Sequence, residues 1–432
     1  MKPTTLISVA VVVFLLGGVV AFGFAGGSGS DASLEATWTS DTGTGVAANH
    51  HAVAVADNRV YAPISGTGGT DECALVAVSA GTGATLWDYD IPATNCTIHA
   101  VADPTVADVD GDGTGEVLAA TTEREVTVFD AGGAVTARHR LSDYGYTKPV
   151  VADLSPEPGT ETVAVDVAGT VFVFDADGAE LWRATLDEYV WAQPVVDDFD
   201  ADGDSELLVA GRAGDATLFA GDGSVEWSRT VAGGDSVTWG THGQADDDRP
   251  LEAVLSTVDG DVIAVDGASG RVEWRRTVGT FAAVRAFGDG DGDGEPEVYA
   301  VGREGELRAF DAASGDTEWV TETVVERVQM MPPPTLGDLD GDGEPELLAA
   351  GNDGTVTLVD PATGDVLSTY GRDVPIFTHA TLADVDGDGG QEAFVMYADG
   401  RVVRLDVPVA DGVKRIGGDR VGAIGTGLSV GT

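Results

Sequence analysis

Lysine, cysteine and methionine are scarce in this 432-residue chain, and acidic residues greatly outnumber basic ones. It has three lysines, and its 23 basic residues face 73 acidic ones, for a formal net charge of −50. Such a surface repels phosphates and anionic lipids, so neither nucleic acid nor an anionic membrane surface is expected as a ligand. The excess is typical of a salt-tolerant, halophilic surface, where ionic strength screens self-repulsion. Cation binding is a second, compatible interpretation.

The cysteine count is equally restrictive. No cysteine lies near residue 25, which excludes a lipoprotein anchor. The two present, Cys73 and Cys96, each precede an apolar alternating segment of the same repeat. An extracellular setting permits a disulfide between them, and the alternative is two separately buried thiols.

The N-terminus carries a long apolar run, from Leu6 to Ala25, after a single lysine. Its length, about the 20 residues that span a bilayer, favours an uncleaved transmembrane helix over a signal peptide. A small-x-small site at residues 23–25 leaves cleavage as the alternative. We therefore expect residues 1–25 to be an anchor or signal, residues 26–33 a linker, and the remainder to lie outside the cytoplasm.

A hairpin pattern recurs along the chain, most clearly at residues 260–274. An alternating strand, a glycine-containing turn and a returning strand that ends in tryptophan indicate an antiparallel hairpin. The same frame recurs at residues 170–182, 215–227 and 306–319. Tryptophans at one position of every repeat are expected to pack between repeats rather than to stack on a cofactor.

Acidic loops of the form D-x-D-x-D-G-x-x-E follow the same period. Three carboxylates at alternate positions, a glycine for the sharp turn and a closing glutamate are hard oxygen ligands that suit Ca²⁺. Five loops are complete, and we expect about five structural Ca²⁺ sites. Their residues are Asp108, Asp110, Asp112 and Glu116; Asp198, Asp200, Asp202 and Glu206; Asp289, Asp291, Asp293 and Glu297; Asp338, Asp340, Asp342 and Glu346; and Asp384, Asp386, Asp388 and Glu392.

Degraded loops at residues 153–161 and 246–252 complete the period and are expected to bind metal weakly or not at all. A period of 45 to 50 residues with about four short strands per unit predicts an all-β propeller. Counting gives eight blades, with seven as the alternative. The propeller is expected over residues 34–408, closed by a strand around Trp38, with a glycine-rich tail at 409–432.

The hairpin at 260–274 resembles the pyrroloquinoline-quinone (PQQ)-like propeller repeat, and the acidic loops resemble the calcium loops of FG-GAP repeats in integrin α-chains. Together the resemblances cover about residues 34–408 and suggest a haloarchaeal cell-surface protein. They imply a Ca²⁺-stabilised propeller that acts in binding, adhesion or envelope assembly, with a protein or glycan partner at the cell surface and no catalytic residues. The alternative is a quinone-dependent dehydrogenase with its cofactor on the propeller axis.

Aromatic and histidine residues just before the loop-bearing strands are candidates for the channel mouth. Core packing is the favoured interpretation of the aromatic set, and a partner-binding rim is the alternative. His50 and His51 are adjacent, so in a strand they point to opposite faces and make a poor metal pair. The aromatic and sulfur-containing set is Trp191, Trp239, Tyr144, Tyr146, Tyr189, Phe281, Met330, Met331 and Phe377, and the histidines expected to be packing or polar lining are His99, His242 and His379.

Overall fold

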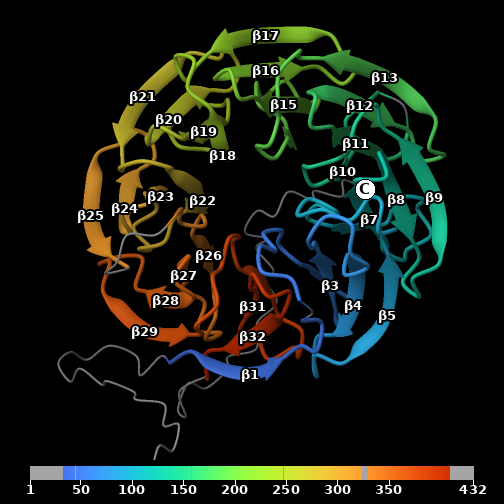
Figure 1. Ribbon diagram of the computed structural model, residues 1–432. Helices are drawn as coiled ribbons and strands as arrows, with labels where there is room; N and C mark the ends of the chain where they lie inside the picture. Colours follow the sequence, from blue (N-terminus) through green and yellow to red (C-terminus); the bar gives the residue numbers. More distant parts are fainter. Residues whose placement is uncertain (1–32, 44, 157, 247, 324–328, 409–432) are drawn as a thin grey trace, which may run out of the picture. The chain divides into compact units, whose positions relative to one another are not determined.

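The computed structural model describes residues 33–408 apart from 44, 157, 247 and 324–328. Within these residues, eight four-stranded antiparallel sheets surround a common axis (Figure 1). This confirms the all-β propeller of eight blades, and the seven-bladed alternative is wrong. None of the described residues forms a helix able to cross a membrane. The anchor or signal predicted for residues 1–25 and the tail predicted for 409–432 lie outside the described residues.

The strands follow the chain blade by blade. The first four blades are β2 (Ala54–Ala56), β3 (Arg59–Ile64), β4 (Ala74–Ser79), β5 (Thr85–Asp90); β6 (Thr105–Ala107), β7 (Glu116–Thr121), β8 (Glu125–Phe129), β9 (Val135–Arg140); β10 (Val150–Ala152), β11 (Glu161–Val165), β12 (Thr170–Phe174), β13 (Glu180–Thr185); and β14 (Val195–Asp197), β15 (Glu206–Ala210), β16 (Asp215–Phe219), β17 (Val225–Thr230). The others are β18 (Val237–Gly243), β19 (Glu252–Thr257), β20 (Asp261–Asp266), β21 (Val272–Thr277); β22 (Ala283–Gly288), β23 (Glu297–Val301), β24 (Glu306–Asp311), β25 (Thr317–Glu322); β26 (Thr335–Gly337), β27 (Glu346–Ala350), β28 (Thr355–Val359), β29 (Val366–Gly371); and β30 (Thr381–Ala383), β31 (Glu392–Met396), β32 (Val402–Asp406) with β1 (Glu35–Thr39).

The core lies between blades. Second strands such as β15 are buried along their whole length, as expected of short apolar runs covered on both faces. Fourth strands such as β13 lie at the outer edge of the ring and alternate exposed with half-buried side chains (Figure 1). One apolar cluster joins Leu208 and Leu218 of the fourth blade to Leu255 and Ile263 of the fifth. Each blade thus buries its apolar faces against its neighbours.

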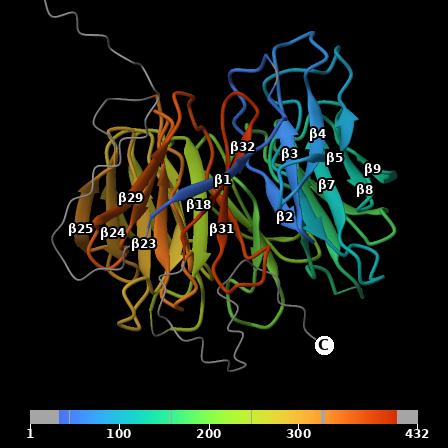
Figure 2. The same cartoon turned by 90° about the horizontal axis from the view of Figure 1, so that it is seen from below.

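The N-terminal strand closes the ring. β1 pairs antiparallel with β32, and both views show the two strands side by side (Figures 1 and 2). Its register shifts by one residue just before Trp38, and an equivalent β-bulge interrupts the outermost strand pair of the other seven blades. The predicted closure by the strand around Trp38 is therefore confirmed, and it removes an exposed sheet edge.

The repeated tryptophans brace neighbouring blades, as predicted. The indole Nε1–H of Trp227 donates to the carbonyl oxygen of Gly267 in the next blade, at 2.7 Å. Gly270 in that turn has a φ of +68°, and a Cβ there would lie 2.6 Å from the indole ring, so glycine lets the ring lie against the turn. The same inter-blade hydrogen bond is made by Trp38, Trp87, Trp182, Trp274 and Trp319.

A disulfide joins Cys73 to Cys96, with their Cα atoms 5.4 Å apart. Both cysteines are fully buried. The bond ties the start of β4 to the segment that leads into the second blade. His99 lies three residues beyond Cys96 in this segment.

Candidate functional site

The two candidate sites lie on opposite faces of the ring. Consecutive strands of a blade are antiparallel, so the connections between first and second strands and between third and fourth strands share one face. The five acidic loops are connections between first and second strands. The segments that link one blade to the next lie on the other face and carry most of the predicted aromatic and histidine residues, whereas Trp239 and His242 lie within β18.

Each acidic loop is folded around its own carboxylates. Asp338 accepts hydrogen bonds from the backbone N–H groups of Gly341, at 2.7 Å, and Gly343, at 3.0 Å. Glu346, the first residue of β27, accepts one from the N–H of Leu339 at 2.8 Å. The other complete loops repeat two of these bonds. The first aspartate accepts from the glycine at the sixth position, and the closing glutamate accepts from the second residue of the loop; the residues are Asp108, Asp198, Asp289 and Asp384, and Glu116, Glu206, Glu297 and Glu392.

The carboxylates of a loop converge closely enough to share one cation. One oxygen from each of Asp289, Asp291, Asp293 and Glu297 lies within 4.8 Å of the others, and the same holds for the loop closed by Glu392. Burial and then the nearby aspartates raise the pKa of Glu346 to about 8. A divalent ion would relieve this repulsion, and the donors fit Ca²⁺.

The degraded loops keep their closing glutamate but lack the full set of three aspartates at alternate positions. Glu161 accepts hydrogen bonds from the N–H groups of Leu154 and Ser155, at 2.9 and 2.8 Å. Glu252 accepts one from the N–H of Ala245, at 2.6 Å. The glutamate therefore braces the turn whether or not a full ligand set is present, so it alone does not indicate a metal.

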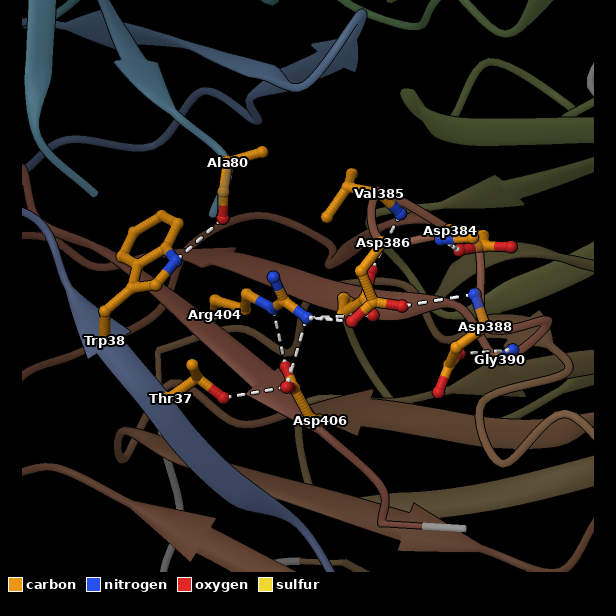
Figure 3. A network of polar contacts seen from close by, with 12 residues as sticks. Thr37, Trp38, Ala80, Asp384, Val385, Asp386, Asp388, Gly390, Arg404 and Asp406 are labelled. Atoms are coloured by element: carbon orange, nitrogen blue, oxygen red, sulfur yellow. Dashed lines mark hydrogen bonds and ion pairs between the residues drawn. The ribbon is translucent and has the colours of Figure 1, made fainter. Parts of the chain in front are cut away.

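The loop closed by Glu392 differs from the others because an arginine reaches into it (Figure 3). The buried guanidinium of Arg404, on β32, lies 3.0 Å from Asp386, 2.9 Å from Glu392 and 2.8 Å from Asp406. Asp406 also accepts a hydrogen bond from the hydroxyl of Thr37 on β1. This loop carries its own positive charge, which the sequence motif did not indicate.

A cavity of about 340 Å³ opens on the axis at the opposite face. All eight blades or their leading segments contribute to its lining. Most lining side chains are apolar or aromatic, with Asp103, Gln193 and two histidines as the principal polar groups. Its residues are Ala48, His50, His51, Ile98, Asp103, Tyr146, Trp191, Gln193, Thr238, Trp239, Phe281, Ala282, Gln329, Met330, Met331 and Phe377.

Seven of the nine predicted aromatic and sulfur-containing residues line this cavity, so they lie at the channel mouth as expected. Core packing also holds for part of the set, since Trp191 and Trp239 pack against apolar core clusters. Met331 is fully buried, whereas Trp191, Trp239, Phe281, Met330 and Phe377 are half-buried and line the opening. The other two pack beside the cavity: the Tyr144 ring stacks on His99, and the Tyr189 ring contacts Tyr146.

The histidines behave differently from the expectation. His50 and His51 precede β2 and are not in a strand, so their rings do not point to opposite faces: the centroids are 4.5 Å apart. His50 Nε2 lies 3.0 Å from Nδ1 of His99. Burial lowers the pKa of His50 to about 3 and that of His99 to about 4, with further lowering from neighbouring histidines, so both rings are neutral at pH 7.

Asp103 was missed by sequence reasoning. Its carboxylate accepts hydrogen bonds from Nδ1–H of His51, at 2.9 Å, and from the N–H of Ala52, at 3.0 Å. Burial alone would raise the pKa of Asp103, but the bond to His51 and nearby positive groups hold it below its usual value. No repeated motif marks Asp103 in the sequence, because its partners His51 and Ala52 lie in an irregular segment before β2.

The predicted lining histidines have separate environments. His242 Nε2 lies 3.0 Å from a carboxylate oxygen of Asp197, away from the cavity lining. His379 is buried and its ring contacts Trp239. Packing or polar lining therefore describes both, and it also describes His99, which bonds His50 and stacks on Tyr144.

Comparison with known proteins gives a family match and a set of similar structures. A family model described as outer membrane protein assembly factor BamB matches residues 122–335 and 258–412. BamB from Moraxella catarrhalis has 15% identity and a TM-score of 0.59, over 87% of this chain and 98% of that one. The Vibrio cholerae biofilm matrix protein Bap1 has 13% identity and a TM-score of 0.65, over 87% and 91% of the chains. Quinohemoprotein alcohol dehydrogenase from Comamonas testosteroni has 12% identity and a TM-score of 0.62, over 89% of this chain and 78% of that one. No curated protein sequence matches the chain.

Proposed function

The chain belongs to the PQQ-like β-propeller family described by the outer membrane protein assembly factor BamB, and from this premise we propose that it is a non-enzymatic binding or assembly module. We place it at the outer face of the cell membrane or in the envelope. The disulfide supports this placement, because such bonds persist in oxidising compartments outside the cytoplasm. The partner is a protein that contacts the mouth of the axial cavity.

The observation that carries the proposal is the apolar rim of this mouth. We use this name for Ile98, Trp191, Phe281, Met330 and Phe377, which come from five different blades and are all at least partly exposed. Apolar and aromatic side chains around a hollow favour a protein contact, because an inserted side chain there is desolvated. Elsewhere the surface is strongly acidic, so the rim is the distinct place for a partner to bind.

A charge in the rim is expected to abolish partner binding. Met330→Asp should weaken capture of an envelope protein by more than about tenfold, because the carboxylate has no partner in an apolar contact. Photo-crosslinking from a residue beside the rim, followed by mass spectrometry, measures it. Val225→Asp, on exposed β17 at the outer edge, is the matched control and should bind as the unaltered protein does. Equal crosslinking by both variants would contradict the proposal.

The alternative is a quinone-dependent dehydrogenase, which the similar alcohol dehydrogenase structure and the axial cavity keep open. Such enzymes are expected to hold Ca²⁺ and quinone with a Glu, Asn and Asp group. Among the described residues that line the cavity, Asp103 is the one carboxylate, and His51 and Ala52 already occupy it. Adding quinone and Ca²⁺ to the purified protein decides the matter: a stoichiometric chromophore or dye-linked alcohol oxidation would support the enzyme.

We also propose that the five complete acidic loops bind Ca²⁺ and that the ions are structural. The convergent carboxylates and the raised pKa of Glu346 support this. Each ion would bind the native state in preference to the unfolded chain and so stabilise the ring. The loops lie opposite the rim, so the ions set the stability of the scaffold rather than contact the partner.

Asp340→Ala is expected to remove one Ca²⁺ site of the five. At a Ca²⁺ concentration 100 times the dissociation constant, losing that site costs about 2.7 kcal/mol of stability. Calorimetric titration of chelator-treated protein should give four sites instead of five. Asp316→Ala, which removes an exposed acidic residue outside the loops, should leave five. Five sites of unchanged affinity in Asp340→Ala would rule out metal binding by this loop.

A further inference from the structure

Three histidines meet beside the axial cavity at its mouth, on the face opposite the acidic loops. One ring nitrogen from each of His50, His51 and His99 lies within 4.8 Å of the other two. The ring of Tyr146 contacts all three, with centroids 6.2, 5.3 and 5.1 Å away, and keeps them together. We propose that these histidines bind a first-row divalent transition metal ion such as Zn²⁺ or Cu²⁺.

Hydrogen bonds fix which nitrogens are available. Nδ1 of His50 lies 2.9 Å from the carbonyl oxygen of Ala48, which can only accept, so this nitrogen carries the hydrogen. Nδ1 of His51 donates in the same way to the Asp103 carboxylate. With Nδ1 engaged in these hydrogen bonds, Nε2 is the nitrogen of each ring that remains available to a metal. A histidine held by a carboxylate or carbonyl on its far nitrogen is the usual arrangement in metal sites.

The spacing suits a small ion with imidazole ligands. Nε2 of His50 and Nδ1 of His99 are 3.0 Å apart. Tetrahedral Zn²⁺ with bonds of about 2.0–2.1 Å separates its ligand nitrogens by about 3.3 Å. An ion therefore fits between the two rings after a small displacement of the imidazoles. It would replace the hydrogen of the hydrogen bond between His50 and His99.

An unpartnered atom points to the same conclusion. Nε2 of His51 is buried and has no hydrogen-bond partner among the described residues. A polar atom in this position is normally satisfied, so its lack of a partner needs an explanation. Coordination of a metal supplies that partner. Three protein nitrogens also leave a fourth position for water or a ligand from the cavity.

The donor type sets the class of metal. Imidazole suits Zn²⁺, Cu²⁺ and Ni²⁺, whereas Ca²⁺ takes oxygen ligands. The site is therefore chemically distinct from the carboxylate loops, and the two can be filled separately. The proposal does not depend on the protein partner or on the acidic loops.

Cobalt titration tests the site. Chelator-treated protein is given a millimolar excess of Ca²⁺ to occupy the acidic loops and is then titrated with Co²⁺. One equivalent is expected to give the intense visible absorption of four- or five-coordinate Co²⁺ with nitrogen ligands. His50→Gln and His99→Gln should lose this band, and His242→Gln, a histidine outside the cluster, should keep it. No band in the unaltered protein, or an unchanged band in both cluster variants, would overturn the proposal.

Two further measurements do not rely on removing a ligand. Cu²⁺ electron paramagnetic resonance of the unaltered protein should show hyperfine splitting from three nitrogens, and an oxygen-only spectrum would contradict the site. Asp103 is a positioning residue, so Asp103→Asn should keep one equivalent of Co²⁺ but weaken its affinity about 10- to 100-fold. Unchanged affinity in Asp103→Asn would show that the carboxylate does not orient a metal-binding histidine.

Discussion

Removing Ca²⁺ with a chelator is expected to lower the thermal unfolding midpoint more than any single substitution in the acidic loops. An ion that binds only the native state contributes about 2.7 kcal/mol at 100 times its dissociation constant. Five such sites would together contribute about 10 kcal/mol or more, which is comparable with the whole stability of a typical domain. The chain carries 50 excess negative charges, so removing ten positive ones also increases its self-repulsion.

Neighbouring loops are connected, so the loss should spread around the ring. The N–H of Gln391 donates to the carbonyl oxygen of Asp338 in the adjacent blade, at 2.8 Å. The N–H of Leu251 donates to Phe199 in the same way, at 3.1 Å. When one loop loosens, its neighbour therefore loses a hydrogen bond. We expect chelation to lower the unfolding midpoint of the whole propeller rather than to release one blade.

The stabilisation that comes from salt screening of the acidic surface has to be separated from the stabilisation that comes from Ca²⁺ binding. Calorimetric unfolding is compared in Ca²⁺, in Mg²⁺ and in NaCl, all at the same ionic strength. Loops that bind Ca²⁺ specifically should give a large rise in midpoint only with Ca²⁺, because Mg²⁺ demands tighter octahedral geometry and dehydrates reluctantly. An equal rise in NaCl would mean that the loops are acidic turns that benefit from screening alone.

The fold was largely predictable because its repeated residues occupy fixed structural positions. The closing glutamate is the first residue of the second strand in seven blades. The tryptophan follows the β-bulge of the outermost strand in six blades. The number of blades can therefore be read from the spacing of these residues in the sequence. The segment around Trp38 was identified as the closing strand because the last unit, which starts near Pro375, lacks a tryptophan-bearing last strand of its own. Periodicity thus favoured eight blades over seven and indicated closure by the N-terminal strand, and the structure shows both.

The axial cluster was not predictable, because it depends on contacts that no repeat records. His50 and His99 are one blade period apart, but their approach depends on the path of two irregular segments near the axis. The rule that adjacent residues point to opposite faces failed for His50 and His51 because they lie before a strand and not within it. Arg404 was missed for a similar reason, since its partners belong to a loop and to its own strand.

Replacing Arg404 by methionine is expected to destabilise the Ca²⁺-free protein by about 3–5 kcal/mol, the usual cost of breaking a buried ion pair. Its guanidinium is buried between Asp386, Glu392 and Asp406. Burial raises the pKa of Glu392 to about 7, and Arg404 opposes this rise. Without the arginine, these carboxylates repel one another with no compensating charge.

Calcium is expected to restore much of the stability that Arg404→Met loses, because the ion supplies positive charge to Asp386 and Glu392. In the unaltered protein the guanidinium already occupies these oxygens, so this loop should bind Ca²⁺ more weakly than the other four. Chemical denaturation with and without Ca²⁺, together with calorimetric titration, measures both effects. Arg308→Met is the matched control, since Arg308 pairs with Glu306 outside any acidic loop, and its cost should not depend on Ca²⁺. If the loss in Arg404→Met were the same with and without Ca²⁺, the ion and the arginine would not share these carboxylates, and Arg404 would stabilise the closing blade independently of metal.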